Sequence, residues 1–286
     1  MKRVIEQVDT PQGEPGFLGA GHIARPVIQR SFAESDPFIM LMDDMLDKKD
    51  STPVGGPHPH AGFETVTLMI EGSLGLGKHA MQAGDMQMMT AGSGIVHTET
   101  IDKPSKVRIL QLWLNLPKAD KWVAPRVQDI SLDKVPATTI GGMSVKLYSG
   151  TLAGLTSPVQ NYTPMILADV ALQADTQSTL QVPANYNTFL YMLEGSVTIG
   201  NTTLHVDQVG WLNIAPDDTL SDIDMTAGST GARFVMYSGK PTGDAIKPYG
   251  PFIGNDSKDI LRLYNEYNQG LMKHVTTLPK EQQLVW

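Results

Sequence analysis

Cysteine is absent from the 286 residues of this sequence. Its absence excludes disulfide bonds, zinc sites built from thiolates and catalysis by a thiol nucleophile. Any metal ion bound by this protein would therefore be held by histidine and carboxylate side chains.

Positive charge is also scarce, since 22 Lys and Arg residues face 30 Asp and Glu residues and give a formal net charge of −8. Such a surface repels phosphate backbones, and the sequence has no basic patch, so we expect no direct binding to nucleic acid. No apolar run approaches the roughly 18 residues of a membrane-spanning helix, and residues 1–9 lack the apolar segment of a signal peptide. We therefore expect a cytoplasmic protein without membrane contact.

Short apolar segments rich in Val, Ile, Thr and Leu recur along the chain, for example at residues 38–42, 65–70 and 107–114. Strands of this kind, separated by turn residues, are typical of an all-β sandwich or barrel. One helix is predicted near the end, with Ser257 as its N-cap and Gly270 at its stop. We expect its apolar face to pack on the barrel; this face comprises Ile260, Leu261, Leu263, Tyr264, Tyr267 and Leu271.

A weak internal repeat indicates two domains. Residues 65–73 (TVTLMIEGS) are similar to residues 188–196 (TFLYMLEGS), and a glycine-containing hairpin is expected after each copy. A repeat of this length favours duplication of a whole β domain, because solenoid repeats are shorter. The sequence therefore predicts two tandem β domains, residues 1–135 and residues 136–286, the second including the helix and tail. Two fused domains can bury each other's edges, so we expect a monomer.

Two pairs of potential metal ligands lie in the first domain. His58 and His60 are two residues apart, and so are His97 and Glu99. Side chains at this spacing in a strand point to the same face, so one ion can reach both members of a pair. Together they supply three imidazole nitrogens and one carboxylate, which suits a divalent first-row metal with open coordination positions. Between residues 141 and 240 the only histidine is His205, so the second domain cannot form the same site.

These motifs resemble those of the pirin family of two-domain cupins. The similarity is most specific in the first half of the chain, at HPH (58–60), GFETVT (62–67), Glu71-Gly72, GDMQ (84–87), MTAG (89–92) and GIVHTE (94–99). Shorter matches occur at DPF (36–38), LP (116–117), PRVQ (125–128) and YGPF (249–252). The resemblance covers nearly the whole chain and implies a bicupin fold.

The resemblance also implies that His58, His60, His97 and Glu99 bind one mononuclear metal ion, usually iron. Manganese, cobalt, nickel and copper suit the same donors. A loosely bound Glu99 could in addition act as the base that takes a substrate proton, with Glu64 as the alternative to Glu99.

The sequence departs from the family pattern in two places. Ala61 stands where an arginine is common, which removes a cation beside the site. Residues 73–82 (SLGLGKHAMQ) replace the usual polar stretch of the hairpin, and His79 within them is expected to face solvent. These changes bear most directly on substrate preference.

Three functions are compatible with this site. The first is a dioxygenase that uses iron(II) and O₂ to cleave flavonols such as quercetin, as the resemblance implies. The second is an iron-dependent, redox-sensing regulator that binds a protein partner without catalysis. The third is a metal-dependent isomerase or hydrolase, since cupins support many chemistries. We rank the enzyme first because four residues encode a metal site, whereas no segment encodes a partner surface.

Overall fold

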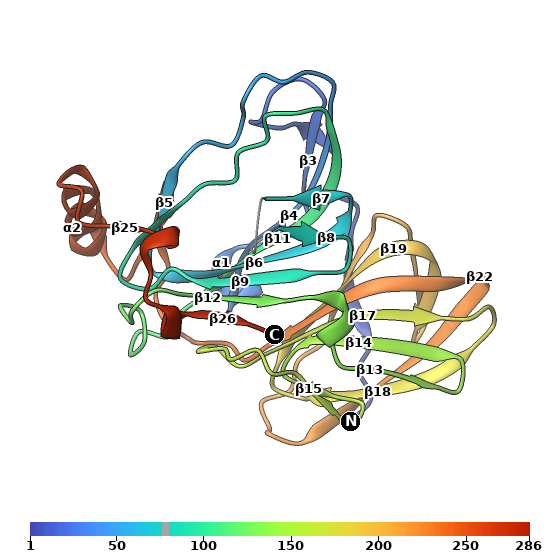
Figure 1. Ribbon diagram of the computed structural model, residues 1–286. Helices are drawn as coiled ribbons and strands as arrows, with labels where there is room; N and C mark the ends of the chain where they lie inside the picture. The colour runs from blue at the N-terminus through green and yellow to red at the C-terminus, as the bar shows by residue number, and fades with distance from the viewer. Residues whose placement is uncertain (76–79) are drawn as a thin grey trace. The chain divides into compact units, whose positions relative to one another are not determined.

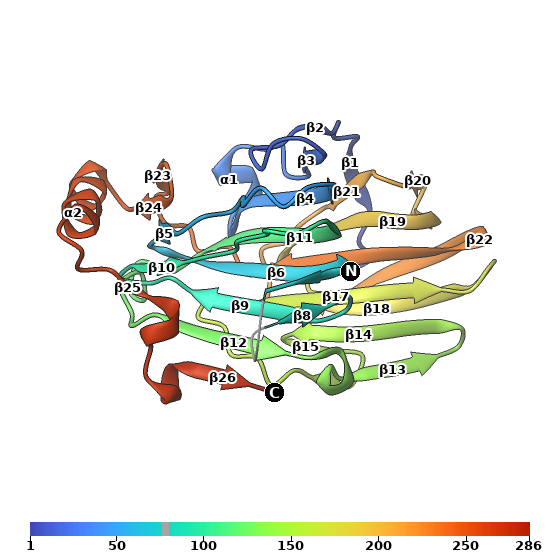
Figure 2. The same ribbon diagram turned by 45° about the horizontal axis from the view of Figure 1, so that its top comes forward.

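Figures 1 and 2 show the computed structural model, which describes residues 1–75 and 80–286. Most of these residues lie in strands or in the turns between them, so the all-β class predicted from the sequence is confirmed. Within the described ranges, no helix is long and apolar enough to cross a membrane. His79 lies outside the described residues, as do its three preceding neighbours.

The described residues form two compact units, and neither is continuous in sequence. The first, which we call the histidine unit, consists of Gln12–Lys134 and Thr242–Trp286. The second unit consists of Met1–Pro11 and Val135–Pro241. The expected ranges 1–135 and 136–286 therefore need correction at both ends of the chain, since each terminal segment belongs to the other unit.

Strand pairing explains why each unit includes a segment from the opposite end of the chain. β1 (Ile5–Asp9) pairs antiparallel with β21 (Val209–Leu212), so the start of the chain belongs to the second unit. β26 (Gln283–Val285) pairs in parallel with β12 (Arg126–Ile130), so the end of the chain belongs to the histidine unit. In each case the terminal strand supplies backbone partners to an edge that would otherwise lack them.

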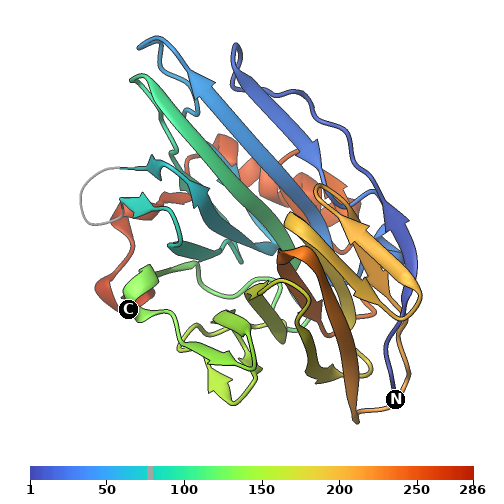
Figure 3. The ribbon, with the colours of Figure 1, turned by 90° about the vertical axis from the view of Figure 1, so that its right-hand side faces the viewer.

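The main sheet of the histidine unit has the strand order β2-β3-β4-β11-β6-β9-β12-β26. The long strands β4 and β11, blue and green in Figure 3, pair along most of their length. Because side chains alternate between the two faces of a strand, Met40 and Met42 lie on one face and Asp43 on the other. Besides β12 and β26, this sheet contains β2 (Glu14–Pro15), β3 (His22–Pro26), β4 (Phe38–Lys48), β6 (Phe63–Glu71), β9 (Met86–Thr90) and β11 (Ser105–Asn115).

A small sheet in the same unit has the order β25-β10-β5 and carries the predicted site. Its strands are β5 (His58–His60), β10 (Ile95–His97) and β25 (Lys273–His274). The remaining elements of the unit are the helix α1 (Phe32–Ser35), the hairpin of β7 (Ser73–Leu74) and β8 (Met81–Gln82), the hairpin of β23 (Lys247–Tyr249) and β24 (Phe252–Gly254), and the 3₁₀ turns η2 (Leu132–Lys134), η3 (Val275–Thr277) and η4 (Lys280–Gln282).

The predicted helix is present as α2 (Ser257–Asn268), with Asp256 rather than Ser257 as its N-cap. The Asp256 carboxylate accepts hydrogen bonds from the backbone N–H groups of the second and third helical residues, which a free helix end would leave unpaired. Ile260 and Leu263 are buried against Ala61 and Phe252. The helix therefore packs within the histidine unit, and its buried face is narrower than predicted, because Leu261 and Leu271 are exposed.

The segment that leads to α2 is anchored to the histidine unit by Asp36. Its carboxylate accepts hydrogen bonds from Thr242 Oγ1 at 2.9 Å and from the backbone N–H of Gly243 at 2.7 Å. Asn115 Nδ2 donates to the same Thr242 hydroxyl oxygen at 3.1 Å. These contacts fix the start of the terminal segment, residues 242–286, within the histidine unit.

The second unit is built on a sheet with the order β1-β21-β19-β22-β17-β14-β13, in which β18 also pairs with β22 and β20 with β19. Both copies of the sequence repeat begin on an inner strand, β6 in one unit and β19 in the other. Apolar side chains such as Met192 and Phe234 fill the core of the second unit. Its other strands are β13 (Ala137–Ile140), β14 (Met143–Ser149), β15 (Thr151–Leu152), β16 (Leu155–Thr156), β17 (Met165–Leu172), β18 (Gln177–Pro183), β19 (Asn187–Ile199), β20 (Thr202–His205) and β22 (Leu220–Gly239).

Candidate metal centre

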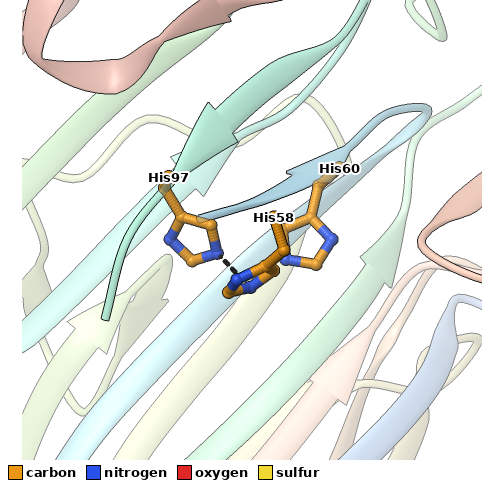
Figure 4. A group of neighbouring side chains, drawn as sticks. All are labelled: His58, His60 and His97. Carbon is orange, nitrogen blue, oxygen red and sulfur yellow. Dashed lines mark hydrogen bonds between the residues drawn. The ribbon is translucent and has the colours of Figure 1, made fainter. Parts of the chain in front are cut away.

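Strand pairing brings three histidines together. β5 and β10 are antiparallel, with His97 opposite His58 and Ile95 opposite His60. Since His58 and His60 share one face of β5, all three imidazoles converge on one point (Figure 4). One nitrogen from each ring lies within 4.8 Å of the other two. Two nitrogens bound side by side at about 2.1 Å from one ion would lie roughly 3 Å apart, so the cluster is compact enough to bind a single metal.

Local contacts orient two of the rings. His58 Nδ1 lies 2.9 Å from the carbonyl oxygen of Gly56 and donates to it, which directs Nε2 into the cluster. That Nε2 lies 2.8 Å from Nε2 of His97 (Figure 4). His60 packs edge-on against Phe63 and Trp113, each with a ring-centroid distance of 5.3 Å. Such outer contacts hold ligand rings in place before an ion binds.

Burial keeps two of these imidazoles neutral. It lowers the pKa of His60 to about 3, with a further contribution from the neighbouring His58. It lowers the pKa of His97 to about 2, with contributions from His60, His58 and His274. Only the neutral imidazole has a lone pair for a metal, so both rings are in the binding form at neutral pH.

Acidification is expected to destabilise the metal-free protein through these two rings. Their folded pKa values lie below the unfolded value of about 6.5. The unfolded chain therefore binds more protons below about pH 6.5, and the free energy of unfolding falls as the pH is lowered from there toward 4. Each ring contributes at most about 1.4 kcal/mol per pH unit. We expect His97→Gln to make this slope shallower by about that amount in urea denaturation with chelator present; equal slopes would contradict the assignment.

Glu99 lies near the three histidines but outside the compact cluster. Among the described residues, the atoms within 4.8 Å of one another come from the histidines alone. Glu99 nevertheless lines the same cavity, and its carboxylate accepts no hydrogen bond from any described residue. Burial raises its pKa, His58 opposes this shift, and Asp44 adds to it. A bound cation would supply the partner that this carboxylate lacks, so the donor set fits a divalent metal.

Glu64, the alternative to Glu99, points elsewhere. It is fully buried on β6 and accepts a hydrogen bond of 2.7 Å from Thr90 Oγ1. Its neighbour Phe63 contacts His60, so alternation along the strand places Glu64 on the opposite face from the histidines. Ala61 is likewise buried away from the imidazoles, in the cluster with Phe252 and Ile260, so it fills space against the terminal segment.

A cavity of about 330 Å³ adjoins the cluster and is lined by all three histidines and Glu99. Its wall is mostly apolar and includes Met40, Met42, Ile109 and Trp113 from β4 and β11. It also includes three polar residues that sequence reasoning missed, His22, Asp44 and Gln111. The available signal was the strand alternation of residues 40–46, which puts Asp44 on the same face as Met40 and Met42. A second cavity, of about 240 Å³, shares His97 and Glu99 and is lined in part by the terminal segment at His274 and Gln283.

Comparison with known proteins identifies the family. Residues 22–114 match the model of the pirin family, and residues 167–273 match that of the pirin C-terminal cupin domain. A pirin-like protein from Solanum lycopersicum is 35% identical over 279 residues, which cover 94% of this chain and 91% of that protein. The chain belongs to the pirin family. The bicupin architecture expected from the motifs of this pirin is thereby confirmed.

Solved structures with the same fold include two of interest here. Quercetin 2,3-dioxygenase from Acinetobacter baumannii superposes with a TM-score of 0.80 and 24% identity, covering 95% of this pirin and 98% of that chain. The bacterial pirin YhhW from Escherichia coli, in complex with nickel(II), superposes with a TM-score of 0.60 and 19% identity, covering 81% and 95% of the two chains. At these identities the similarity establishes the fold of this pirin.

Proposed function

We propose that this pirin-family protein is a metal-dependent dioxygenase of quercetin-type flavonols, with iron(II) held by His58, His60, His97 and Glu99. One observation carries the proposal: three converging imidazoles line a largely apolar cavity of about 330 Å³ together with the Glu99 carboxylate, which accepts no hydrogen bond from any described residue. Such a cavity suits a flat aromatic molecule whose polar end reaches the metal ligands. Names of similar structures, a quercetin 2,3-dioxygenase and a nickel-bound pirin, support this proposal.

When bound, the ion would supply Lewis acidity toward a hydroxy-ketone group of the substrate and redox chemistry with O₂. Manganese, cobalt, nickel and copper suit the same donors. The protein supplies position and proton transfer. Met40, Met42 and Trp113 lie on the apolar wall, where they contact the substrate rings and displace water. The raised pKa of Glu99 makes its carboxylate a suitable acceptor for the substrate hydroxyl proton.

Oxygen uptake tests this proposal. We expect the iron-loaded protein to consume O₂ when quercetin is added. The His58→Ala variant should lose at least about 99% of that rate, because removing a direct metal ligand should cost more than the 10- to 100-fold loss caused by removing an outer contact. His205→Ala, in the hairpin strand β20 of the second unit, is the matched control and should keep the full rate. Metal binding without flavonol-dependent O₂ uptake would overturn the proposed dioxygenase function. It would favour the alternative function, a regulator that binds a protein partner.

A further inference from the structure

A hydrogen-bonded pair, His22 and Asp44, lies on the cavity wall and is not among the proposed metal ligands. His22 is on β3 and Asp44 on the adjacent strand β4. His22 Nε2 lies 2.9 Å from Asp44 Oδ1. The His22 side chain is fully buried, whereas 16% of the Asp44 side chain is exposed, and both residues line the cavity shared with the three histidines.

The orientation of His22 is fixed from several sides. The backbone N–H of Leu18 donates to His22 Nδ1 at 3.1 Å, so the ring carries its proton on Nε2 and donates it to Asp44. Phe17 packs edge-on against the ring at a centroid distance of 5.5 Å. Gly16 lies so close that a Cβ atom there would overlap the imidazole. His22 is therefore a rigid donor that positions the Asp44 carboxylate.

The second oxygen of the Asp44 carboxylate, Oδ2, is not used by His22. Among the described residues, Asp44 Oδ2 accepts no hydrogen bond. A complementary donor lies beside it: Gln111 Oε1 accepts from Thr67 Oγ1 at 2.7 Å, and no described residue accepts from Gln111 Nε2. In the β4–β11 register Asp44 is opposite Ile109 and Met42 is opposite Gln111, so Asp44 and Gln111 are diagonal neighbours on the cavity face. A hydrogen-bond acceptor and a donor thus lie side by side in a mostly apolar wall.

We propose that Asp44, oriented by His22, determines the substrate specificity of this cavity by accepting a hydrogen bond from a hydroxyl group on the substrate's aromatic ring, while Gln111 donates to a neighbouring substrate oxygen. The substrate class is an aromatic compound with a hydroxyl group in addition to its metal-binding group. This assignment rests on the proposed function for the metal-binding end. An analogue without that hydroxyl leaves the Asp44 carboxylate oxygen that faces the cavity without a partner, and an unpaired polar group of this kind is the basis of strong discrimination in polar sites.

Equilibrium binding of two flavonols tests the assignment without requiring turnover. Quercetin and 3-hydroxyflavone share the metal-binding hydroxy-ketone, but only quercetin carries further hydroxyl groups. We expect the metal-loaded protein, kept anaerobic, to bind quercetin at least about 10-fold more tightly, the typical effect of a hydrogen bond to a charged group. Asp44→Asn keeps the bond from His22 and replaces the free acceptor with a donor. We expect it to reduce the preference to about 2-fold by weakening quercetin alone.

Two further variants separate positioning from packing. His22→Gln leaves Asp44 in place without its rigid donor and should reduce the preference partially. Met45→Leu changes the residue next to Asp44 on the opposite face of β4, outside the cavity lining, and should leave the ratio of the two affinities unchanged. An unchanged preference in Asp44→Asn, with the fold retained by circular dichroism, would overturn the assignment.

A second ligand pair keeps this test independent of the proposed activity. If neither flavonol binds, the flavonol function fails, and 2-naphthol and 2-methoxynaphthalene decide the role of Asp44, because neither ligand needs the metal. A preference for the hydroxyl compound that is lost in Asp44→Asn would support the assignment. Equal affinities for the two naphthalenes in the unaltered protein would overturn it.

Discussion

Replacing His97 with alanine is expected to abolish metal binding. His97 contributes one of three nitrogens that lie within 4.8 Å of one another, and its Nε2 directly faces that of His58. Loss of an outer contact alone weakens metal affinity by about 10- to 100-fold, so loss of a direct ligand should exceed this range. The purified protein should contain about one metal ion per chain and the variant less than about one tenth of that. Plasma emission spectroscopy measures both values, before and after anaerobic loading with Fe(II).

The control for this experiment is His205→Ala, which removes an exposed imidazole from the second unit and should leave the metal content unchanged. Circular dichroism and thermal unfolding establish that the His97 variant is folded. A folded His97→Ala protein that retains one ion per chain would contradict the site. Absence of metal from the unaltered protein, even after loading, would contradict the enzyme function as well.

The largest effect on stability is expected for Gly62→Ala. Gly62 has a φ of 85°, and a Cβ atom at this position would overlap the carbonyl oxygen of Ile253 in β24. Its own N–H donates to the carbonyl oxygen of Gly92 at 2.8 Å, so the residue is fixed between two segments and cannot move aside. The left-handed conformation costs an alanine about 1–2 kcal/mol, and overpacking costs a further 1–3 kcal/mol. We expect the free energy of unfolding to fall by about 3 kcal/mol or more.

Gly19→Ala is the matched control, since Gly19 has a φ of 87° with nothing within 4 Å of the added methyl group. It reports the cost of the backbone conformation alone, about 1–2 kcal/mol. Urea denaturation of both variants gives the difference, which is the cost of the overlap with Ile253. Equal destabilisation would mean that the terminal segment yields to the added methyl and is not rigidly packed at this point.

The three histidines could be placed from sequence because they lie within regular strands. His58 and His60 lie on the same face of β5, as their two-residue spacing predicts, and His97 is the last residue of β10. Glu99 lies beyond the end of β10, so the two-residue period that predicted its direction no longer applies there. Instead its backbone N–H donates to the carbonyl oxygen of Gly55 at 3.2 Å. This is why the carboxylate lines the cavity without joining the compact cluster.

Other features depend on contacts that no local pattern records. The unit boundaries failed at the ends because β1 and β26 each pair with a strand far away in sequence. The partnership of His22 and Asp44 depends on the register of β3 with β4, in which Asp44 is opposite Ala24. Composition and periodicity specify which face a residue takes, but the neighbour across the sheet is set by register. The fold class and the approach of the three histidines were therefore predictable, and the hydrogen bond between His22 and Asp44 was not.

Because the histidine unit includes residues 242–286, it is completed only after the residues of the second unit have been synthesised. β25 lies in parallel beside β10, the strand that carries His97, and β26 completes the edge next to β12. Both are made after all the residues of the second unit, so the ligand strand lacks one neighbour until the ribosome has passed Lys273 and His274. Contacts so distant in sequence also form slowly. We therefore expect stable capture of a metal ion to follow synthesis of the terminal segment, which makes a nascent chain ending near residue 241 a poor metal binder.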